Sequence, residues 1–252
     1  MNGITNLIKK NSITILILSS FIIVTIYAIT NIQKYDKVIK NEDGYNIHLM
    51  IKNDVLRYFS HGNEIKDDLK NGKDYFDTGR QNFTKYLYPR IVAAYYLAFD
   101  LNLFLDDDVE KNKVERLIAK GVHTKFLILQ ILLYYLSLIF LYKQIKHKFS
   151  NKILFFLLAF LCLEPTIVQY HGSFWSESIF FSLQILILAL TLNDNNKPIK
   201  FFILGILLSL LALQRTNGFF YIIPIIIYFF AIYRFNFLKK IPYLIIGFLI
   251  LL

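Results

Sequence analysis

The sequence predicts an all-α, polytopic membrane protein with about seven transmembrane helices and a large extracytoplasmic loop after the first of them. Of its 252 residues, 56% are hydrophobic and 18% are charged, whereas a typical soluble domain has about 25% charged residues. The mean hydropathy is +0.46, and the charges are clustered, so that long apolar runs lie between them. These observations indicate several membrane spans rather than one water-soluble core.

The first span is predicted over Ile13 to Thr30, and Lys9 and Lys10 precede it. A helix of that length rises about 27 Å, enough to cross a thin bilayer core. A cleaved signal peptide would have a shorter apolar core and a small-x-small cleavage site, which the Tyr-Ala-Ile-Thr ending of this run does not resemble. We therefore predict a retained signal anchor with the N-terminus in the cytoplasm.

The stretch 31–121 holds most of the acidic residues and many tyrosines. We expect short helices over Ile47–Phe59 and Glu64–Leu69. The run Tyr86–Leu105 is apolar but is interrupted by a proline, an arginine and an aspartate, which favours a helix lying at the membrane interface. The alternative is a second span, which would invert the sidedness of everything after it.

Six further apolar runs follow, and the predicted layout treats 1–252 as a single membrane domain made of the first span, the loop 31–121 and the remaining spans over 122–252. The runs are Phe126–Tyr142, Ile153–Tyr170, Ser178–Leu192, Phe201–Leu213, Phe219–Tyr233 and Ile241–Leu252. The second of them contains a Glu-Pro pair that interrupts it. The sequence ends on IIGFLILL with no polar tail, which we interpret as a truncated sequence, a split gene or the N-terminal module of a longer protein.

The basic residues alternate between the short loops, which predicts the sidedness of the chain. KQIKHKFSNK, NDNNKPIK and RFNFLKK are rich in Lys and Arg, whereas HGSFWSE has neither and QRTNG has one arginine. The alternation fits seven spans with the N-terminus inside. It predicts that residues 31–121, Glu177 and Arg215 share the extracytoplasmic side.

Glu164, Glu177 and Arg215 lie within or at the ends of apolar runs, where an ionisable group is costly unless it is paired or hydrated. Each is therefore a candidate functional residue, and the structural alternative is an interhelical ion pair, for example between Glu177 and Arg215. Asp54, in the segment IKNDVLRYF, is followed by apolar residues at helical spacing. This pattern predicts a carboxylate at the start of a helix close to the membrane.

Other functional classes find no support in the sequence. The net charge is +10, but the basic residues flank apolar runs or lie in one mixed-charge loop, which argues against nucleic-acid binding. The only cysteine, Cys162, lies in an apolar run and excludes an intrachain disulfide and a cysteine metal site. The histidines lack metal-ligand spacing, and the run Asp106–Asp108 is interpreted as solvated charge, so no metal site is predicted.

Three stretches, in this order, resemble the membrane glycosyltransferases of the GT-C class, in particular the bacterial relatives of protein O-mannosyltransferases and aminoarabinose transferases (glycosyltransferase family 39). NDVLRYFSHGNEIKD resembles the acidic motif in the first outer loop of that family, and NFTKYLYPRIVAAYYLA resembles its Tyr-Pro interfacial helix. EPTIVQYHGSFWSESIFFSLQILIL and LGILLSLLALQRTNGFFYIIP resemble its Ser-Glu span and its glycine-to-arginine pair of spans. The likeness covers about residues 13 to 233. The chain departs from the family in having Asn53 beside Asp54 instead of two acidic residues, and in having Glu164-Pro165 instead of Asn-Pro.

The resemblance implies an inverting glycosyltransferase of a bacterial inner membrane. It would move a sugar from a polyprenyl-phosphate carrier in the bilayer to a glycan, lipid or protein acceptor outside the cytoplasm. It implies Asp54 as the base and a set of donor phosphate ligands: Lys85, Arg90 and Arg215. It implies supporting roles for a carboxylate and three aromatic residues: Glu177, Tyr58, Tyr88 and Trp175. The resemblance gives no definite cofactor and leaves room for a divalent cation. The alternative functions are a transporter or flippase fragment, or a non-catalytic membrane scaffold.

Overall fold

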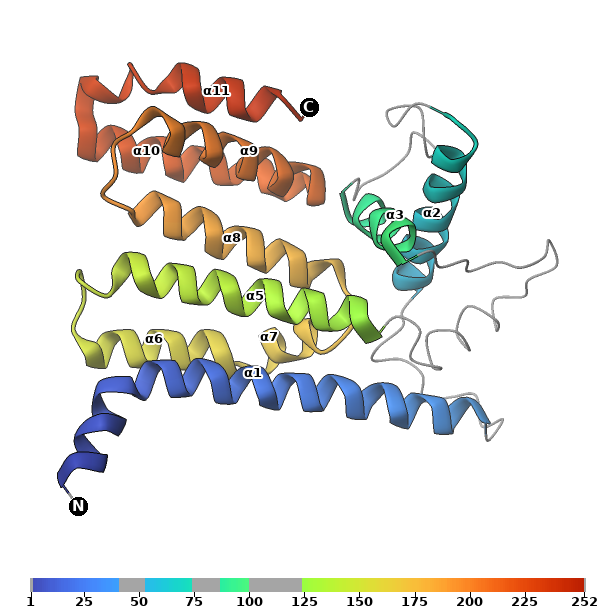
Figure 1. The fold of residues 1–252 in the computed structure, drawn as a ribbon. Coiled ribbons are helices and arrows are strands. Elements are labelled where there is room, and N and C mark those ends of the chain that lie inside the picture. Colours follow the sequence, from blue (N-terminus) through green and yellow to red (C-terminus); the bar gives the residue numbers. More distant parts are fainter. Residues whose placement is uncertain (1, 41–52, 74–86, 100–123, 252) are drawn as a thin grey trace. The chain divides into compact units, whose positions relative to one another are not determined.

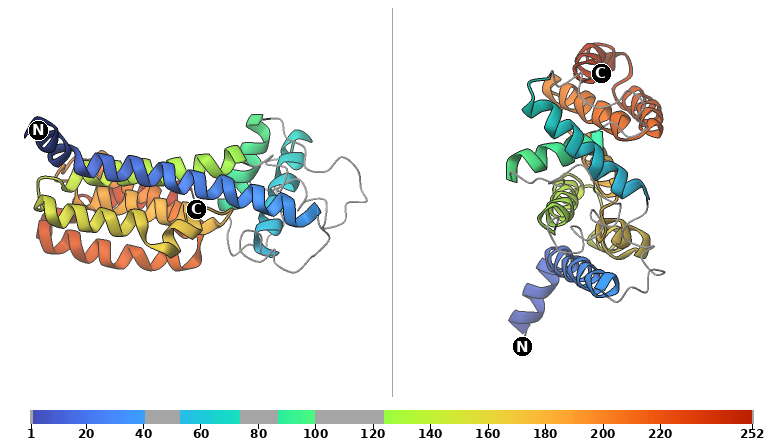
Figure 2. Two further views of the ribbon diagram at one scale, coloured as in Figure 1. Left: turned by 90° about the horizontal axis from the view of Figure 1, so that it is seen from below. Right: turned by 90° about the vertical axis from the view of Figure 1, so that its right-hand side faces the viewer.

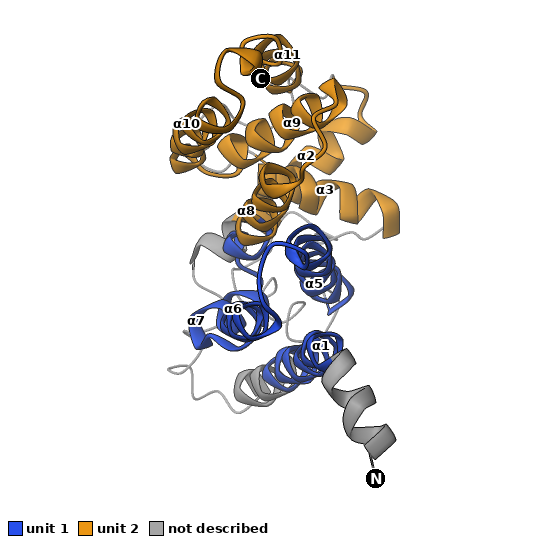
Figure 3. Cartoon of the chain, turned by 90° about the vertical axis from the view of Figure 1, so that its left-hand side faces the viewer, with its two compact units in different colours: residues 1–56, 106–179 blue, residues 57–105, 180–252 orange. Residues whose placement is uncertain are grey.

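A computed structural model describes residues 2–40, 53–73, 87–99 and 124–251. In the first two helices, side chains are described for residues 12–31 and 58–70. All regular structure within these ranges is helical (Figure 1). The chain divides into two compact units, each built from two separate stretches of sequence (Figure 3). Unit 1 comprises residues 1–56 and 106–179, and unit 2 comprises residues 57–105 and 180–252.

Unit 1 is formed by α1 (Asn2–Lys40), α5 (Thr124–Ile145), α6 (Asn151–Leu163) and α7 (Pro165–His171). Helix α1 contacts the other three, and Figures 1 and 2 show α1, α5 and α6 side by side. The contacts of α1 follow one stripe, since its buried apolar residues recur at intervals of four or seven positions: Ile13, Ile17, Val24 and Ala28. The other faces of α1 carry exposed isoleucines and leucines, as expected for a helix that faces lipid.

Unit 2 combines α2 (Asn53–Lys70) from residue 57 onward and α3 (Leu87–Phe99) with most of α8 (Ser176–Leu192) and the C-terminal helices. These C-terminal elements are α9 (Pro198–Gln214), η1 (Thr216–Tyr221), α10 (Ile222–Tyr233), η2 (Arg234–Phe237) and α11 (Ile241–Leu249). Helix α9 is central, because it contacts α3, η1 and α11. Its contact with α11 runs through facing glycines, Gly205 and Gly247.

Three helices in the described part of the chain are long and apolar enough to cross a membrane: Ser12–Asn31, Thr124–Ile145 and Thr216–Phe237. Helices α6 and α7 together would make a fourth span, bent by 52° at Glu164. Helices α8 and α9 are apolar but shorter. The protein is therefore an all-α membrane protein, as the sequence predicts, and the seven predicted runs each contain helix; the exact number of spans stays a prediction.

The second helix differs from the sequence-based expectation. We expected two short helices over Ile47–Phe59 and Glu64–Leu69, but one helix, α2, continues from Asn53 through Gly62 to Lys70, and residues 47–52 lie outside the described part. A glycine inside a helix costs about 1 kcal/mol relative to alanine, which disfavours a continuous helix at this position. Here Gly62 lies against α3, where an added Cβ would be 2.5 Å from Val92 Cγ1. The packing of two helices thus overrides the local preference.

The described part of the predicted interfacial helix, α3, is 13 residues long, and its position at the membrane interface stays a prediction. Pro89 is its third residue, where proline is tolerated because no helical hydrogen bond is lost. Helix α3 packs on α2 and also contacts α9. Residues 57–70 of α2 and the whole of α3 therefore belong to the same compact unit as the C-terminal helices.

Candidate functional site

The predicted base, Asp54, is the second residue of α2. Its position in the first turn of a helix agrees with the sequence-based expectation, and a carboxylate there is favoured by the helix dipole. Its side chain lies outside the described set, as does all of Lys85. Tyr58 follows Asp54 by four residues in the same helix, and positions with this spacing share one face of a helix.

Tyr58 and Tyr88 are brought together by the packing of α2 on α3. Their ring centroids are 5.2 Å apart with an interplanar angle of 68°, an edge-to-face arrangement that aromatic pairs favour. Both side chains are buried. The structure thus gives these two tyrosines a packing role between the helices, and contact with a sugar stays a prediction.

Arg90 lies one turn after the start of α3 and is 5% exposed. A buried guanidinium is unusual, because a desolvated charge is costly unless polar partners surround it. The sequence singled out this residue as a phosphate ligand. Its burial is a finding of the structure. Its role as a phosphate ligand stays a prediction.

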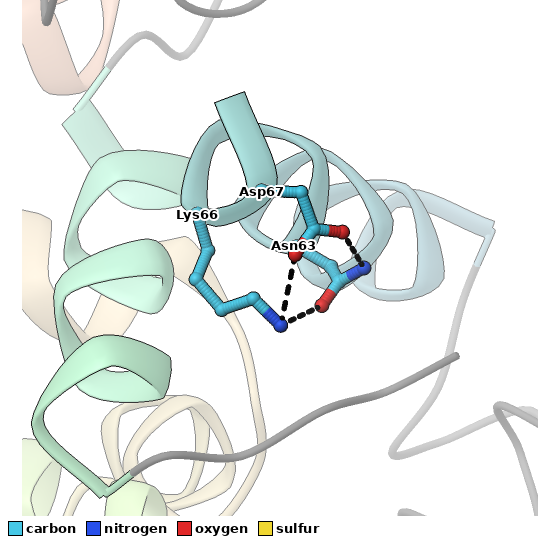
Figure 4. A network of polar contacts seen from close by, with 3 residues as sticks. All are labelled: Asn63, Lys66 and Asp67. Atoms are coloured by element: carbon cyan, nitrogen blue, oxygen red, sulfur yellow. Dashed lines mark hydrogen bonds and ion pairs between the residues drawn. The ribbon is translucent and has the colours of Figure 1, made fainter. Parts of the chain in front are cut away.

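A polar network on α2 was missed by the sequence analysis (Figure 4). Lys66 is 1% exposed, and its Nζ donates to Asn63 Oδ1 at 2.9 Å and lies 3.1 Å from Asp67 Oδ1. Asn63 in turn donates to Asp67 Oδ2 at 3.0 Å. The spacing of three and four residues was a usable signal, because such positions are neighbours on a helix.

Arg215 is the C-cap of α9 and has an extended backbone, with φ −153° and ψ 140°. Its Cζ lies 5.6 Å from the centroid of the Phe180 ring, within the range of a cation–π interaction. The following turn is compact: the Gly218 N–H donates to the Arg215 carbonyl at 2.8 Å. A Cβ on Gly218 would lie 2.3 Å from the Leu211 carbonyl oxygen, so this turn fits only a glycine there.

Glu177 and Trp175 belong to unit 1, at the turn that leads from α7 into α8. Ser176 Oγ donates to Glu177 Oε2 at 3.1 Å, and Gln130 Nε2 donates to the Trp175 carbonyl at 3.3 Å. The Trp175 ring contacts Tyr170 with centroids 5.3 Å apart. Both Glu177 and Trp175 are half-buried. An ion pair between Glu177 and Arg215 stays a prediction, because the two residues lie in different units.

Two other charged residues have local structural roles. Glu164 caps α7, since its carboxylate Oε2 accepts a hydrogen bond from the Ile167 N–H at 2.7 Å. Lys200, which we assigned to a basic loop, is 4% exposed in the first turn of α9. Its Nζ donates to the Asn193 carbonyl at 2.6 Å and lies 4.9 Å from the centroid of the Phe229 ring. Sequence alone does not separate such a buried lysine from its solvated neighbours in a loop.

The fold and these residues define a class: an integral, all-α membrane protein with polar and charged groups held at helix ends. A family model described as dolichyl-phosphate-mannose-protein mannosyltransferase matches residues 115–252, which is more than half of the chain. The chain belongs to this family, and it is therefore a membrane glycosyltransferase of the GT-C type. The resemblance inferred from the sequence is confirmed.

The match includes the segment from α5 to α11, with Trp175, Glu177 and Arg215. Helices α1 to α3, and with them Asp54, precede it. Searches of curated proteins and of solved structures found no match to this chain.

Proposed function

We propose that the protein transfers a sugar from a polyprenyl-phosphate carrier to an acceptor on the extracytoplasmic face of a bacterial inner membrane, with its N-terminus in the cytoplasm. The observation that carries the proposal is the family match over residues 115–252. The description of that family names a sugar linked to dolichyl phosphate, which is a polyprenyl phosphate, and a protein acceptor. The alternation of basic loops supports the same sidedness.

The chemistry requires a base and a stabiliser of the leaving group. The acceptor oxygen attacks the anomeric carbon, the bond from that carbon to the carrier phosphate breaks, and the hydroxyl proton passes to the carboxylate of Asp54. The displaced lipid phosphate keeps the electron pair. A single displacement of this kind inverts the anomeric configuration.

Cationic side chains stabilise the phosphate as its charge develops. We assign this role to Lys85, Arg90 and Arg215. Arginine suits the role because its planar guanidinium can donate two hydrogen bonds to one phosphate. A desolvated arginine such as Arg90 interacts with an anion more strongly than one in water would.

The first experiment measures transfer from labelled polyprenyl-phosphate mannose in proteoliposomes that hold the full chain. Asp54→Asn should lower transfer by about a hundredfold or more, because it removes the base but keeps the shape. Asp68→Asn is the matched control, since Asp68 lies on the same helix and pairs with Lys73 at 2.7 Å. Undiminished transfer by Asp54→Asn would remove this residue from the mechanism.

The second experiment varies the donor concentration. Arg215→Ala should raise the donor concentration that gives half-maximal transfer. Arg215→Lys should raise it less, because lysine keeps the charge but cannot donate two parallel hydrogen bonds to one phosphate. Arg234→Ala is the control, because the prediction places Arg234 in a cytoplasmic loop. An unaltered donor dependence in Arg215→Ala would favour a purely structural role.

Sidedness is tested separately by accessibility labelling. Cys162 is the only cysteine, so Cys162→Ser gives a background in which single cysteines can be placed at positions 54 and 215. Both should react with an impermeant thiol reagent added from the extracytoplasmic side. Labelling from opposite sides would contradict a shared donor site.

A further inference from the structure

The turn between α7 and α8, residues 172–175, is tied to α5 at two points. Gln130 binds the Trp175 carbonyl through its side-chain amide. One helical turn further along α5, the ring of Tyr134 stacks on that of His171, with centroids 3.7 Å apart and an interplanar angle of 27°. Both contacts lie within unit 1. The turn is therefore held by side chains and not by its backbone alone.

His171 connects the two helices that flank this turn. It is the last residue of α7 and is 1% exposed. Its Nδ1 is 2.7 Å from the Oγ of Ser178, which lies in the first turn of α8 and is fully buried. A buried hydrogen bond of this length fixes the end of α7 relative to the start of α8.

The surroundings of His171 are themselves fixed. The Tyr134 hydroxyl donates to the Leu161 carbonyl oxygen at 2.7 Å, which holds the ring on which His171 stacks. On the next residue, Gly172, an added Cβ would lie 2.7 Å from the ring of Tyr27 in α1. Helices α1, α5 and α6 thus all restrict the position of this turn.

Glu177 lies between the two serines of this arrangement. Ser176 donates to its carboxylate, and Ser178 is bound to His171. Both serines are fully buried, whereas Glu177 is half-buried. The direction of the Glu177 side chain therefore depends on the placement of the first turn of α8.

We propose that His171 is a positioning residue, which fixes the first turn of α8 through Ser178 and Tyr134 and so orients the carboxylate of Glu177 for sugar transfer. The part played by Glu177 rests on the proposed function. The placement of the turn by His171 does not rest on it, so the two can be tested apart.

The activity test compares His171→Leu with His171→Asn, because the asparagine amide can place a polar atom close to the position of Nδ1. His171→Leu should lower turnover about ten- to a hundredfold, since small misplacements of a catalytic group have effects of this size, and His171→Asn should restore most of it. The donor concentration for half-maximal transfer should stay within about twofold of wild type in both variants. Wild-type turnover in His171→Leu would overturn the proposal.

A double-mutant cycle asks whether His171 acts through Glu177. On a Glu177→Gln background, His171→Leu should change turnover by no more than about twofold, because the group it positions is already lost. The same loss on both backgrounds would show that His171 acts independently of Glu177 and would overturn the proposal. Ser178→Ala, which removes the hydrogen bond but keeps the His171 ring, replaces His171→Leu if that variant does not fold.

A measurement that does not depend on sugar transfer uses the fluorescence of the only tryptophan, Trp175, which lies in the turn itself. His171→Leu or Ser178→Ala should raise the quenching of Trp175 fluorescence by acrylamide above the wild-type value. Thr191→Ala is the control, because Thr191 donates to the Ile187 carbonyl near the C-terminal end of α8, away from this turn. Unchanged quenching would overturn the positioning role even if the wild-type protein transferred no sugar, whereas raised quenching with an inactive wild type would refute only the proposed function.

Discussion

The close contact between α9 and α11 at their glycines decides whether an alanine there raises or lowers the free energy of unfolding. An alanine at position 205 would place its Cβ 2.2 Å from the Leu244 carbonyl oxygen and 2.8 Å from the Phe248 nitrogen. Both neighbours are backbone atoms of α11, so no side chain can rotate away. The helices would have to separate by about 1 Å to restore ordinary contact.

The size of the effect follows from two opposing contributions. Overpacking of a well-packed interior costs about 1–3 kcal/mol, and we expect the upper end of that range because the obstruction is backbone. Replacing glycine by alanine inside a helix contributes about 1 kcal/mol in the opposite direction. Gly205→Ala should therefore lower the free energy of unfolding by about 2 kcal/mol. In a membrane, such close contacts between small residues are a main source of helix association.

The assay is equilibrium unfolding of the full chain in mixed micelles with increasing SDS, followed by far-UV circular dichroism. Gly247→Ala should behave like Gly205→Ala, since its Cβ would lie 2.1 Å from the Phe202 carbonyl oxygen. The double variant should lose less free energy of unfolding than the sum of the two single losses, because the first alanine already separates the helices. Ile203→Ala, on an exposed face of α9, is the control and should change the free energy by no more than about 0.5 kcal/mol.

A rise in stability of about 1 kcal/mol in Gly205→Ala, as helix propensity alone predicts, would refute the close contact between α9 and α11.

Three further predictions concern helix ends. Glu164→Ala should lower the free energy of unfolding by about 1 kcal/mol, because it removes the cap of α7, whereas Glu164→Gln keeps an acceptor and should lose less in the same SDS titration. Lys200→Met should cost about 2 kcal/mol, since it removes a charge-assisted hydrogen bond and a cation–π contact, and Lys200→Arg should recover part of this; equal stability of the two variants would contradict the role of the charge. Gly218→Ala should disturb the turn after Arg215 and raise the donor concentration for half-maximal transfer, and an unchanged donor dependence would mean that this turn does not position Arg215.

The helices themselves were largely predictable, because apolar runs of sufficient length specify helices in a membrane regardless of their partners. The break at Glu164-Pro165 was visible as well, since a proline cannot continue a helix without losing a hydrogen bond. The role of Glu164 as the cap of α7 was not foreseen, because its position within an apolar run suggested a functional charge. Its carboxylate instead accepts the backbone N–H of Ile167.

The contacts between distant segments could not be read from the sequence. Tyr58 and Tyr88 were each singled out, but their contact depends on α2 packing against α3, and that packing depends on Gly62. Similarly, the sequence shows Gly205 and Gly247 only as glycines within two apolar runs. Their role in close packing becomes visible only in the contact between α9 and α11. Local patterns predict which segments are helical, whereas the pairing of helices depends on shape at positions far apart in the chain.

Each unit is built from two stretches that alternate along the sequence, and this order has a consequence for biogenesis. Helix α3 ends at Phe99, whereas α9, which it contacts, begins at Pro198. At a synthesis rate of about 5–20 residues per second, the ribosome needs roughly 5–20 s to produce the intervening chain. Throughout that time α3, on which α2 packs, exists without the helix α9 that it finally contacts, while unit 1 is completed by residue 179. Nascent chains stalled before residue 198 should therefore contain a finished unit 1 and an undocked α2–α3 pair that chaperones and proteases can still reach.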